Sequence, residues 1–114
     1  MWMTVGEQRF AITLVGDSET SRALEQLLPL SLDMSELNAN EKYASLPRRL
    51  PVRAVRPGTI RAGDLMLYGA DTLVIFYRTF ESTYSYTRVG HVDCPESLAE
   101  ALGRGDVTIR LSVE

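Results

Sequence analysis

Apolar and polar residues alternate with a period of two in several short stretches of this chain. Residues 8–15 carry apolar side chains at every second position, which predicts a first strand. Residues 30–37 alternate strictly and predict a half-buried strand, and residues 107–113 predict a final strand for the same reason. The polar stretch Asn38–Tyr43 lacks this pattern, and we expect it to form a loop.

The densest apolar segment runs from Gly63 to Tyr77 and predicts a β-hairpin. Its two halves are rich in β-branched and aromatic residues, and Gly69 to Asp71 between them can supply the positive-φ residue of a short turn. The second half is apolar on both faces, and strands of this kind are normally covered on both sides. We therefore expect this hairpin in the middle of a closed or sandwiched sheet.

Two short amphipathic helices are predicted between the strands. Asp17 or Ser18 can cap the first helix, and Pro29 ends it. The second helix begins at residues 93–96, where a proline and an acidic residue occupy its first turn, and Gly103 is its expected C-cap. Their apolar stripes are Ala23, Leu24, Leu27 and Leu28 in the first helix and Leu98, Ala99 and Leu102 in the second.

Residues 82–89 favour one more strand, with Tyr84, Tyr86 and Arg88 on one face. Neither face of this strand is purely apolar, which indicates a surface that meets something other than the core. The count is six to eight strands and two helices without a βαβ rhythm. The sequence therefore predicts a mainly β fold, a closed antiparallel barrel with two short helices against it.

Length and composition describe an ordinary globular domain. The 114 residues fit a single domain spanning 1–114, with 45% hydrophobic and 24% charged residues. No apolar run approaches the roughly 20 residues of a membrane helix, so no membrane association is expected. The N-terminus lacks the pattern of a secretory leader, and the one cysteine cannot form an internal disulfide. We expect a cytoplasmic protein.

Charge is unevenly distributed. The net charge of −3 argues against a nucleic-acid partner, but the segment between Arg48 and Arg61 holds five arginines and no acidic residue. Prolines also stiffen the long connection from Leu46 to Ile60. This loop is either a solvated surface or a docking site for an acidic protein partner, and the absence of aromatic residues in it disfavours nucleic acid.

Three polar side chains are candidates for chemistry. Arg88 can anchor an anionic or carbonyl group of a ligand, or it is a surface arginine stacked on Tyr86. His91 is the only histidine, and it is either a ligand-binding or catalytic group or a structural or exposed residue. Arg78 is a further candidate if the protein is an enzyme.

Tyrosines complete the candidate groove. Amphipathic aromatic side chains often line binding sites, although the same residues also pack across strands. Cys94 is expected to be structural, and neither a metal site nor a cofactor is predicted, because one histidine and one cysteine cannot form a zinc site. The candidate ligand-binding residues are Tyr43, Tyr68, Tyr84, Tyr86, Arg88 and His91.

Several of these segments resemble the small bacterial and archaeal cyclophilin-like proteins, over roughly residues 9–112. The resemblance rests on Asn40 to Tyr43, Leu46-Pro47, Pro57 to Tyr68, Tyr84 to Asp93 and Pro95 to Gly103. It implies a closed antiparallel barrel of the cyclophilin type. It implies less about activity, because these proteins are mostly of unknown function.

True cyclophilins catalyse prolyl cis/trans isomerisation. An arginine that donates to the prolyl nitrogen in the twisted state weakens the amide resonance behind a barrier of about 18–20 kcal/mol. This chain lacks the cyclophilin segment in which the catalytic arginine precedes a Phe-Met-x-Gln run, so no arginine is carried over. The sequence therefore favours a binding module for a small molecule or short peptide. The alternative is an isomerase that uses Arg78 or Arg88.

Overall fold

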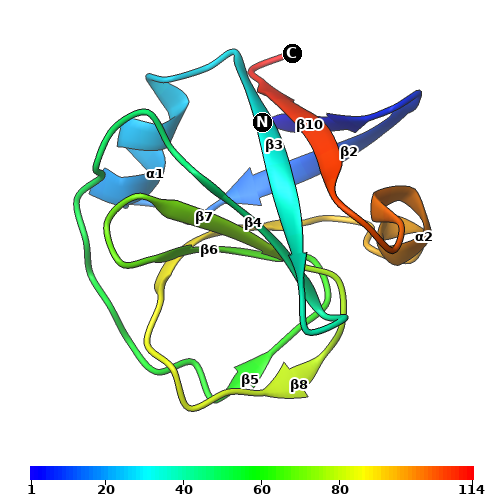
Figure 1. Ribbon diagram of the computed structural model, residues 1–114. Coiled ribbons are helices and arrows are strands. Elements are labelled where there is room, and N and C mark those ends of the chain that lie inside the picture. Colours follow the sequence, from blue (N-terminus) through cyan, green and yellow to red (C-terminus); the bar gives the residue numbers. More distant parts are fainter.

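A computed structural model describes all 114 residues as a closed antiparallel barrel of eight strands (Figure 1). Around the barrel the order is β1, β10, β3, β4, β7, β6, β9 and β2, and β2 pairs again with β1. The predicted mainly β barrel with two short helices is confirmed. The elements are β1 (Trp2–Val5), β2 (Gln8–Leu14), α1 (Glu19–Glu25), β3 (Leu30–Leu37), β4 (Glu41–Ser45), β5 (Thr59–Ile60), β6 (Asp64–Tyr68), β7 (Thr72–Phe76), β8 (Phe80–Glu81), β9 (Thr87–Val92), α2 (Leu98–Leu102) and β10 (Val107–Ser112).

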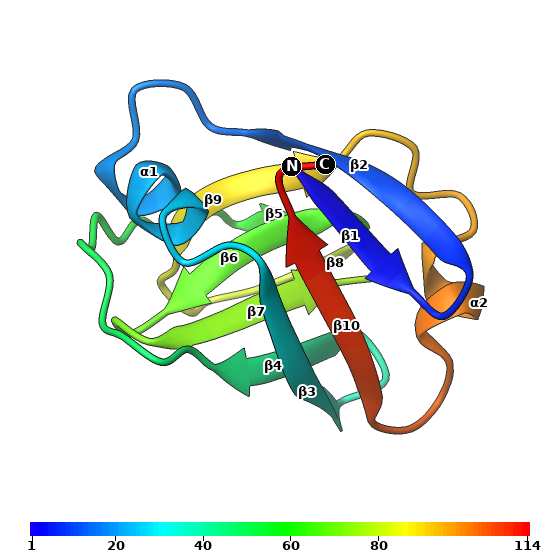
Figure 2. The same ribbon diagram turned by 90° about the horizontal axis from the view of Figure 1, so that it is seen from above.

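The two helices lie at opposite ends of the barrel (Figure 2). Ser18 caps α1, since its Oγ accepts a hydrogen bond from the Ser21 amide at 3.0 Å. Leu24 of α1 and Leu98 and Leu102 of α2 are buried in the same core cluster that fills the barrel. Full burial of such a side chain contributes roughly 1.5–3 kcal/mol, so the helices close the barrel through apolar packing. Neither helix is long and apolar enough to cross a membrane.

The β6–β7 hairpin is buried on both faces, as its sequence predicts. Gly69 has a φ of 61° in the connecting turn, which agrees with the positive-φ position expected there. One face of the hairpin fills the barrel, while the other is covered by an outer layer in which β5 pairs with β8 below the hairpin (Figure 1). The outer core consists of Ile60, Met66, Val74, Phe76 and Tyr86, with Phe80 packed against it.

A buried lysine occupies the barrel end near α2. The Lys42 side chain is 0% exposed, and its Nζ lies 3.0 Å from Glu36 Oε1. It also donates to the carbonyl oxygens of Gly103, at 2.8 Å, and of Gly105. The Tyr77 hydroxyl donates to the same Glu36 oxygen at 2.6 Å. The three hydrogen positions of the ammonium group therefore have partners within the protein.

The prediction of a loop over Asn38–Tyr43 is wrong beyond its first three residues. Asn38 and Ala39 both have a φ of 55° and make a tight turn, after which β4 pairs with β3 and β7. The interior face of β4 carries Lys42, a charged residue where the pattern requires an apolar one. Its two carbonyl partners, Gly103 and Gly105, come from a distant segment, so the alternation of β4 was hidden.

Two other boundaries differ from the sequence prediction. The strand expected at residues 82–89 is β9, from Thr87 to Val92, and the preceding residues cross the outer face of the hairpin. The second helix begins at Leu98 rather than at residues 93–96, after a turn in which the Leu98 amide donates to the Pro95 carbonyl. The first strand, β1, was not predicted.

Candidate functional site

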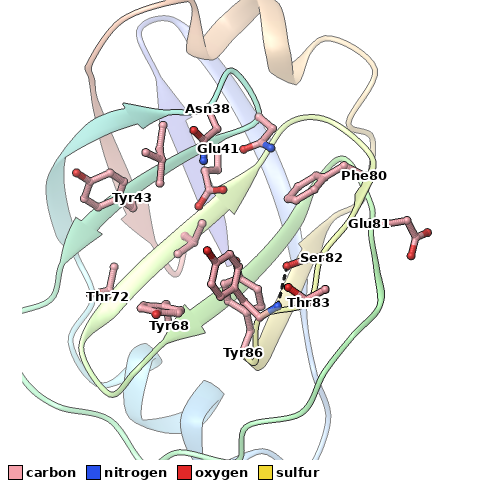
Figure 3. A pocket seen from close by; sticks show the side chains of 14 residues that line it. Asn38, Glu41, Tyr43, Tyr68, Thr72, Phe80, Glu81, Ser82, Thr83 and Tyr86 are labelled. Carbon is pink, nitrogen blue, oxygen red and sulfur yellow. Dashed lines mark hydrogen bonds between the residues drawn. The ribbon is translucent and has the colours of Figure 1, made fainter.

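A pocket of about 570 Å³ opens on the outer wall of the barrel. Strands β4, β7 and β6 form its floor, the segment 80–86 forms one wall, and the β3–β4 turn closes another side (Figure 3). It lies beside the outer core, outside the barrel interior. The lining residues are Leu37, Asn38, Asn40, Glu41, Tyr43, Tyr68, Thr72, Val74, Phe80, Glu81, Ser82, Thr83, Tyr84 and Tyr86.

Strand pairing places the floor residues in one outward-facing row. Tyr43 on β4 pairs with Val74 on β7, and Tyr68 at the end of β6 pairs with Thr72. Because side chains alternate along a strand, Glu41 and Tyr43 point outward when Lys42 points into the barrel. The fold therefore fixes these groups through backbone register.

Aromatic rings pack against one another along the pocket. The Tyr68 ring centroid lies 5.7 Å from that of Tyr86 and 6.4 Å from that of Tyr84, the latter pair edge to face. Tyr86 also packs edge to face against Phe76 at 5.4 Å. These distances lie within the range of favourable aromatic pairs. Tyr86 is buried, while Tyr84 remains 63% exposed at the rim.

Glu41 brings a carboxylate into this aromatic surrounding. Glu41 is only 8% exposed, and Figure 3 shows its side chain between Tyr43 and Phe80. Burial raises the pKa of Glu41, and the charge of Glu36 raises it further. Burial also raises the pKa of Tyr86, with a further contribution from the charge of Glu41. The pocket therefore disfavours the negative charge that Glu41 carries when ionised.

The second lining carboxylate is in a different situation. Glu81 is exposed, and its Oε1 accepts a hydrogen bond from Thr59 Oγ1 at 2.6 Å. In Figure 3 its side chain points away from the tyrosines. Glu41 is therefore the charged group that the pocket interior presents.

The structure brings together only part of the groove predicted from the sequence. All four predicted tyrosines line the pocket: Tyr43, Tyr68, Tyr84 and Tyr86. The polar candidates Arg88, His91 and Arg78 do not line it, and all three are exposed. His91 Nε2 lies 3.7 Å from Asp93 Oδ1.

Strand order explains why Arg88 lies apart from the pocket, because β9 pairs with β6 on the side away from β7 and β4, whereas residues 80–86 cross the outer face of the hairpin. Met66 of β6 pairs with Arg88 and Leu65 pairs with Gly90, so Val89 is an extra residue on β9. Val89 is buried in the barrel core and Arg88 is exposed. The bulge follows Arg88, so it changes the alternation only for the residues after it, such as His91.

Sequence reasoning missed Asn40, Glu41 and Phe80 as pocket residues. Asn40 and Glu41 were assigned to the polar loop, and Phe80 lies in a two-residue strand. The available signal for a strand was the alternation of Glu41, Lys42 and Tyr43, which places Glu41 and Tyr43 on the same face. It was readable only if Lys42 was accepted as an interior residue.

Other candidate features lie elsewhere. Arg48 and Arg49 line a second hollow of about 450 Å³ against α1. Docking of an acidic partner on the Arg48–Arg61 loop stays a prediction. Cys94 is exposed and lies before α2. No group of three or more His, Cys, Asp or Glu residues is arranged to hold a metal ion.

The fold and the pocket define a small closed-barrel protein with an aromatic pocket on its outer wall. The model of a family described as the cyclophilin-like family matches residues 3–113, and the chain belongs to this family. No curated protein and no solved structure matches the chain significantly. The resemblance inferred from the sequence is thereby confirmed.

Proposed function

We propose that this cyclophilin-like protein is a binding module for a small molecule or short peptide and that the outer-wall pocket is its binding site. The observation that carries the proposal is the pocket itself, with its volume of about 570 Å³ and its aromatic lining. Small-molecule sites typically measure about 300–1,000 Å³ and combine apolar walls with a few placed polar groups. The tyrosines supply contact area, and Glu41 and Asn40 supply the polar contacts.

Prolyl isomerisation is the alternative, and the lining residues support it less well. The chemistry needs a donor that reaches the prolyl nitrogen in the twisted state. No arginine lines this pocket, and the sequence candidates Arg78 and Arg88 lie outside it. Binding without accelerated isomerisation is therefore the expected behaviour.

A two-dimensional NMR titration tests the proposal. Labelled protein is titrated with a library of small aromatic and amine-bearing fragments and a panel of short proline-containing peptides. We expect shifts in the amides of residues 38–43 and 80–86, which surround the pocket. Exchange spectra of the peptides should keep the uncatalysed cis/trans rate, with times of tens of seconds or longer.

Two variants separate the pocket from the groove predicted on the sequence. Tyr84→Ala removes an exposed aromatic rim residue and should weaken binding by about tenfold, near the value of one aromatic contact. Arg88→Ala removes an exposed residue outside the pocket and should leave binding unchanged. A reversed result, or shifts confined to residues 88–91, would contradict the proposal. Accelerated exchange would replace it with the isomerase alternative.

A further inference from the structure

The carboxylate of Glu41, a largely buried residue, has no hydrogen-bond or ion-pair partner in the protein. It takes part in neither of the two ion pairs, and no hydrogen bond to its carboxylate contributes to its pKa. Buried charges are normally paired or hydrogen-bonded, because an uncompensated charge is costly away from water. Glu41 is more than nine-tenths buried and faces the pocket. Its missing partner therefore has to come from the pocket side.

A second unpartnered acceptor belongs to Asn40, the residue before Glu41 in the chain. Asn40 Oδ1 is buried and accepts no hydrogen bond, and it is the only buried side-chain nitrogen or oxygen atom without a partner. Asn40 lines the same pocket as Glu41. Two acceptors without donors indicate a ligand that carries N–H or O–H groups.

The charges of the pocket lining favour a cation over an anion among ligands with N–H or O–H groups. None of the twelve lysine and arginine residues lines the pocket, and its two acidic residues are Glu41 and Glu81. An anionic ligand would meet an unscreened carboxylate there. A cation would instead neutralise Glu41 at a site from which much of the water is excluded.

The aromatic walls favour the same choice. The faces of tyrosine rings carry partial negative charge and attract ammonium and guanidinium groups. Tyr68, Tyr84 and Tyr86 form a contiguous group with centroids 5.7 and 6.4 Å apart along one side of the pocket. Tyr43 lies on the opposite side of Glu41 from Phe80 (Figure 3).

We infer that the pocket binds an organic cation with N–H donors, an ammonium or guanidinium group on an apolar body. The head group lies against Glu41 and Asn40, and the body packs on the tyrosines. The inference rests on the proposed function and adds the chemical class of the ligand. A free amine and a basic side chain of a peptide share this chemistry, so both are tested.

Matched pairs of compounds test the inference by NMR titration. The free-amine pair is benzylammonium and benzyl alcohol. The peptide pair is the N-acetyl methylamide of lysine and the same derivative of norleucine. Each cation should bind about tenfold or more tightly than its neutral counterpart, the ratio expected for about 1.4 kcal/mol of ion-pair and cation–π energy. The tighter of the two cations identifies the source. Benzyltrimethylammonium, which has no N–H donor, should bind more weakly than benzylammonium.

Two isosteric variants provide the control. Glu41→Gln should bring the ratio of cation to neutral binding close to one. Glu100→Gln removes an exposed carboxylate on α2, outside the pocket, and should leave the ratio unchanged. A ratio near one in the wild-type protein, with shifts still at the pocket, would overturn the cation inference and leave the binding proposal intact. If neither these compounds nor the fragment library and peptides shift the pocket amides, both fail.

Discussion

Glu41 and Lys42 are consecutive residues of β4, yet the strand turns them toward two different environments. Lys42 points into the barrel end, where one carboxylate and two backbone carbonyls surround its ammonium group. Glu41 points outward into the pocket and has no partner among the protein groups. The strand β4 thus carries Lys42, whose charge has partners within the protein, and Glu41, whose charge has none.

The pKa values of Glu36 and Glu41 shift in opposite directions for the same reason. Burial alone would raise the pKa of Glu36, but hydrogen bonds from Tyr77 and Lys42 outweigh it and hold the pKa below its usual value. Burial raises the pKa of Glu41 with nothing to oppose it. The environment of Glu36 therefore favours its ionised form, while the environment of Glu41 disfavours it and contains no group of the chain that offsets the charge.

The presence or absence of partners within the protein distinguishes a charge with a structural role from a charge that is available for binding. Charges that a fold needs for its own stability are expected to have their partners within the chain. Where local rules are violated without internal compensation, a functional site is the usual reason. By this criterion the Lys42 cluster closes the barrel, and the outer pocket is where we propose that a ligand binds.

The largest expected effect comes from Lys42→Met. This substitution leaves Glu36 without its cation and removes the donor to two carbonyls, so unfolding free energy should fall by about 3 kcal/mol. Urea unfolding measures the change. Arg104→Met removes an exposed cation between the same two glycines and is the matched control, with little change expected. A loss for Lys42→Met no greater than for the control would mean that the cluster is not structural.

A smaller loss is expected from Tyr77→Phe. The substitution removes the hydroxyl that donates to Glu36 at 2.6 Å, and hydrogen bonds to charged groups contribute about 1.5–3 kcal/mol. Tyr43→Phe, at an exposed tyrosine of the pocket, is the matched control and should change stability by less than about 0.5 kcal/mol. Equal effects of the two substitutions in urea unfolding would argue against the Glu36 contact.

Alkaline pH provides a second measure of the same contact. Burial, together with the neighbouring Glu36, raises the pKa of Tyr77 from its ordinary value of 10.0 to about 12. A group whose folded pKa is raised stabilises the fold below its unfolded pKa and loses that contribution as pH rises toward the folded value. The wild-type protein should therefore lose stability between about pH 10 and about 12 more steeply than Tyr77→Phe.

The interior of the fold could largely be predicted from the sequence. The strands β3 and β10 alternate in sequence as they do in the barrel, and the β6–β7 hairpin is apolar on both faces because both faces are covered. These are local patterns with a period of two. These patterns can be recognised in the sequence because an apolar side chain is buried in the core whichever residues it packs against.

The pocket could be predicted only in its aromatic part. Lys42 reads as a surface residue until Gly103 and Gly105, more than sixty residues away, are known to accept its hydrogen bonds. The wall at residues 80–86 depends on the pairing of β5 with β8, each only two residues long. Arg88 was grouped with the tyrosines because the sequence pattern does not show that the chain leaves the outer face of the hairpin after Tyr86 and continues beside β6 as β9. Long-range partners, and not local propensity, decide these features.

The smallest effect, and the one with the opposite sign, is expected from Glu41→Gln. The residue is largely buried and its carboxylate has no partner in the protein, so replacing it with a neutral amide of the same shape should stabilise the empty protein at neutral pH. The expected gain is about 1 kcal/mol, within the range for an unsatisfied buried polar group. Urea unfolding of both proteins, with Glu81→Gln as the control, measures the difference.

The pH dependence of the stability gain from Glu41→Gln tests whether the ionised carboxylate is its cause. A raised folded pKa means that the folded protein holds the proton of Glu41 more tightly than the unfolded chain does. The ionised carboxylate therefore costs stability above the folded pKa, and the cost disappears as pH falls toward about 4, the ordinary value for glutamate. The gain from Glu41→Gln should shrink over the same range. A loss of stability at neutral pH would mean that Glu41 has a partner within the protein, and the distinction between the two faces of β4 would fail.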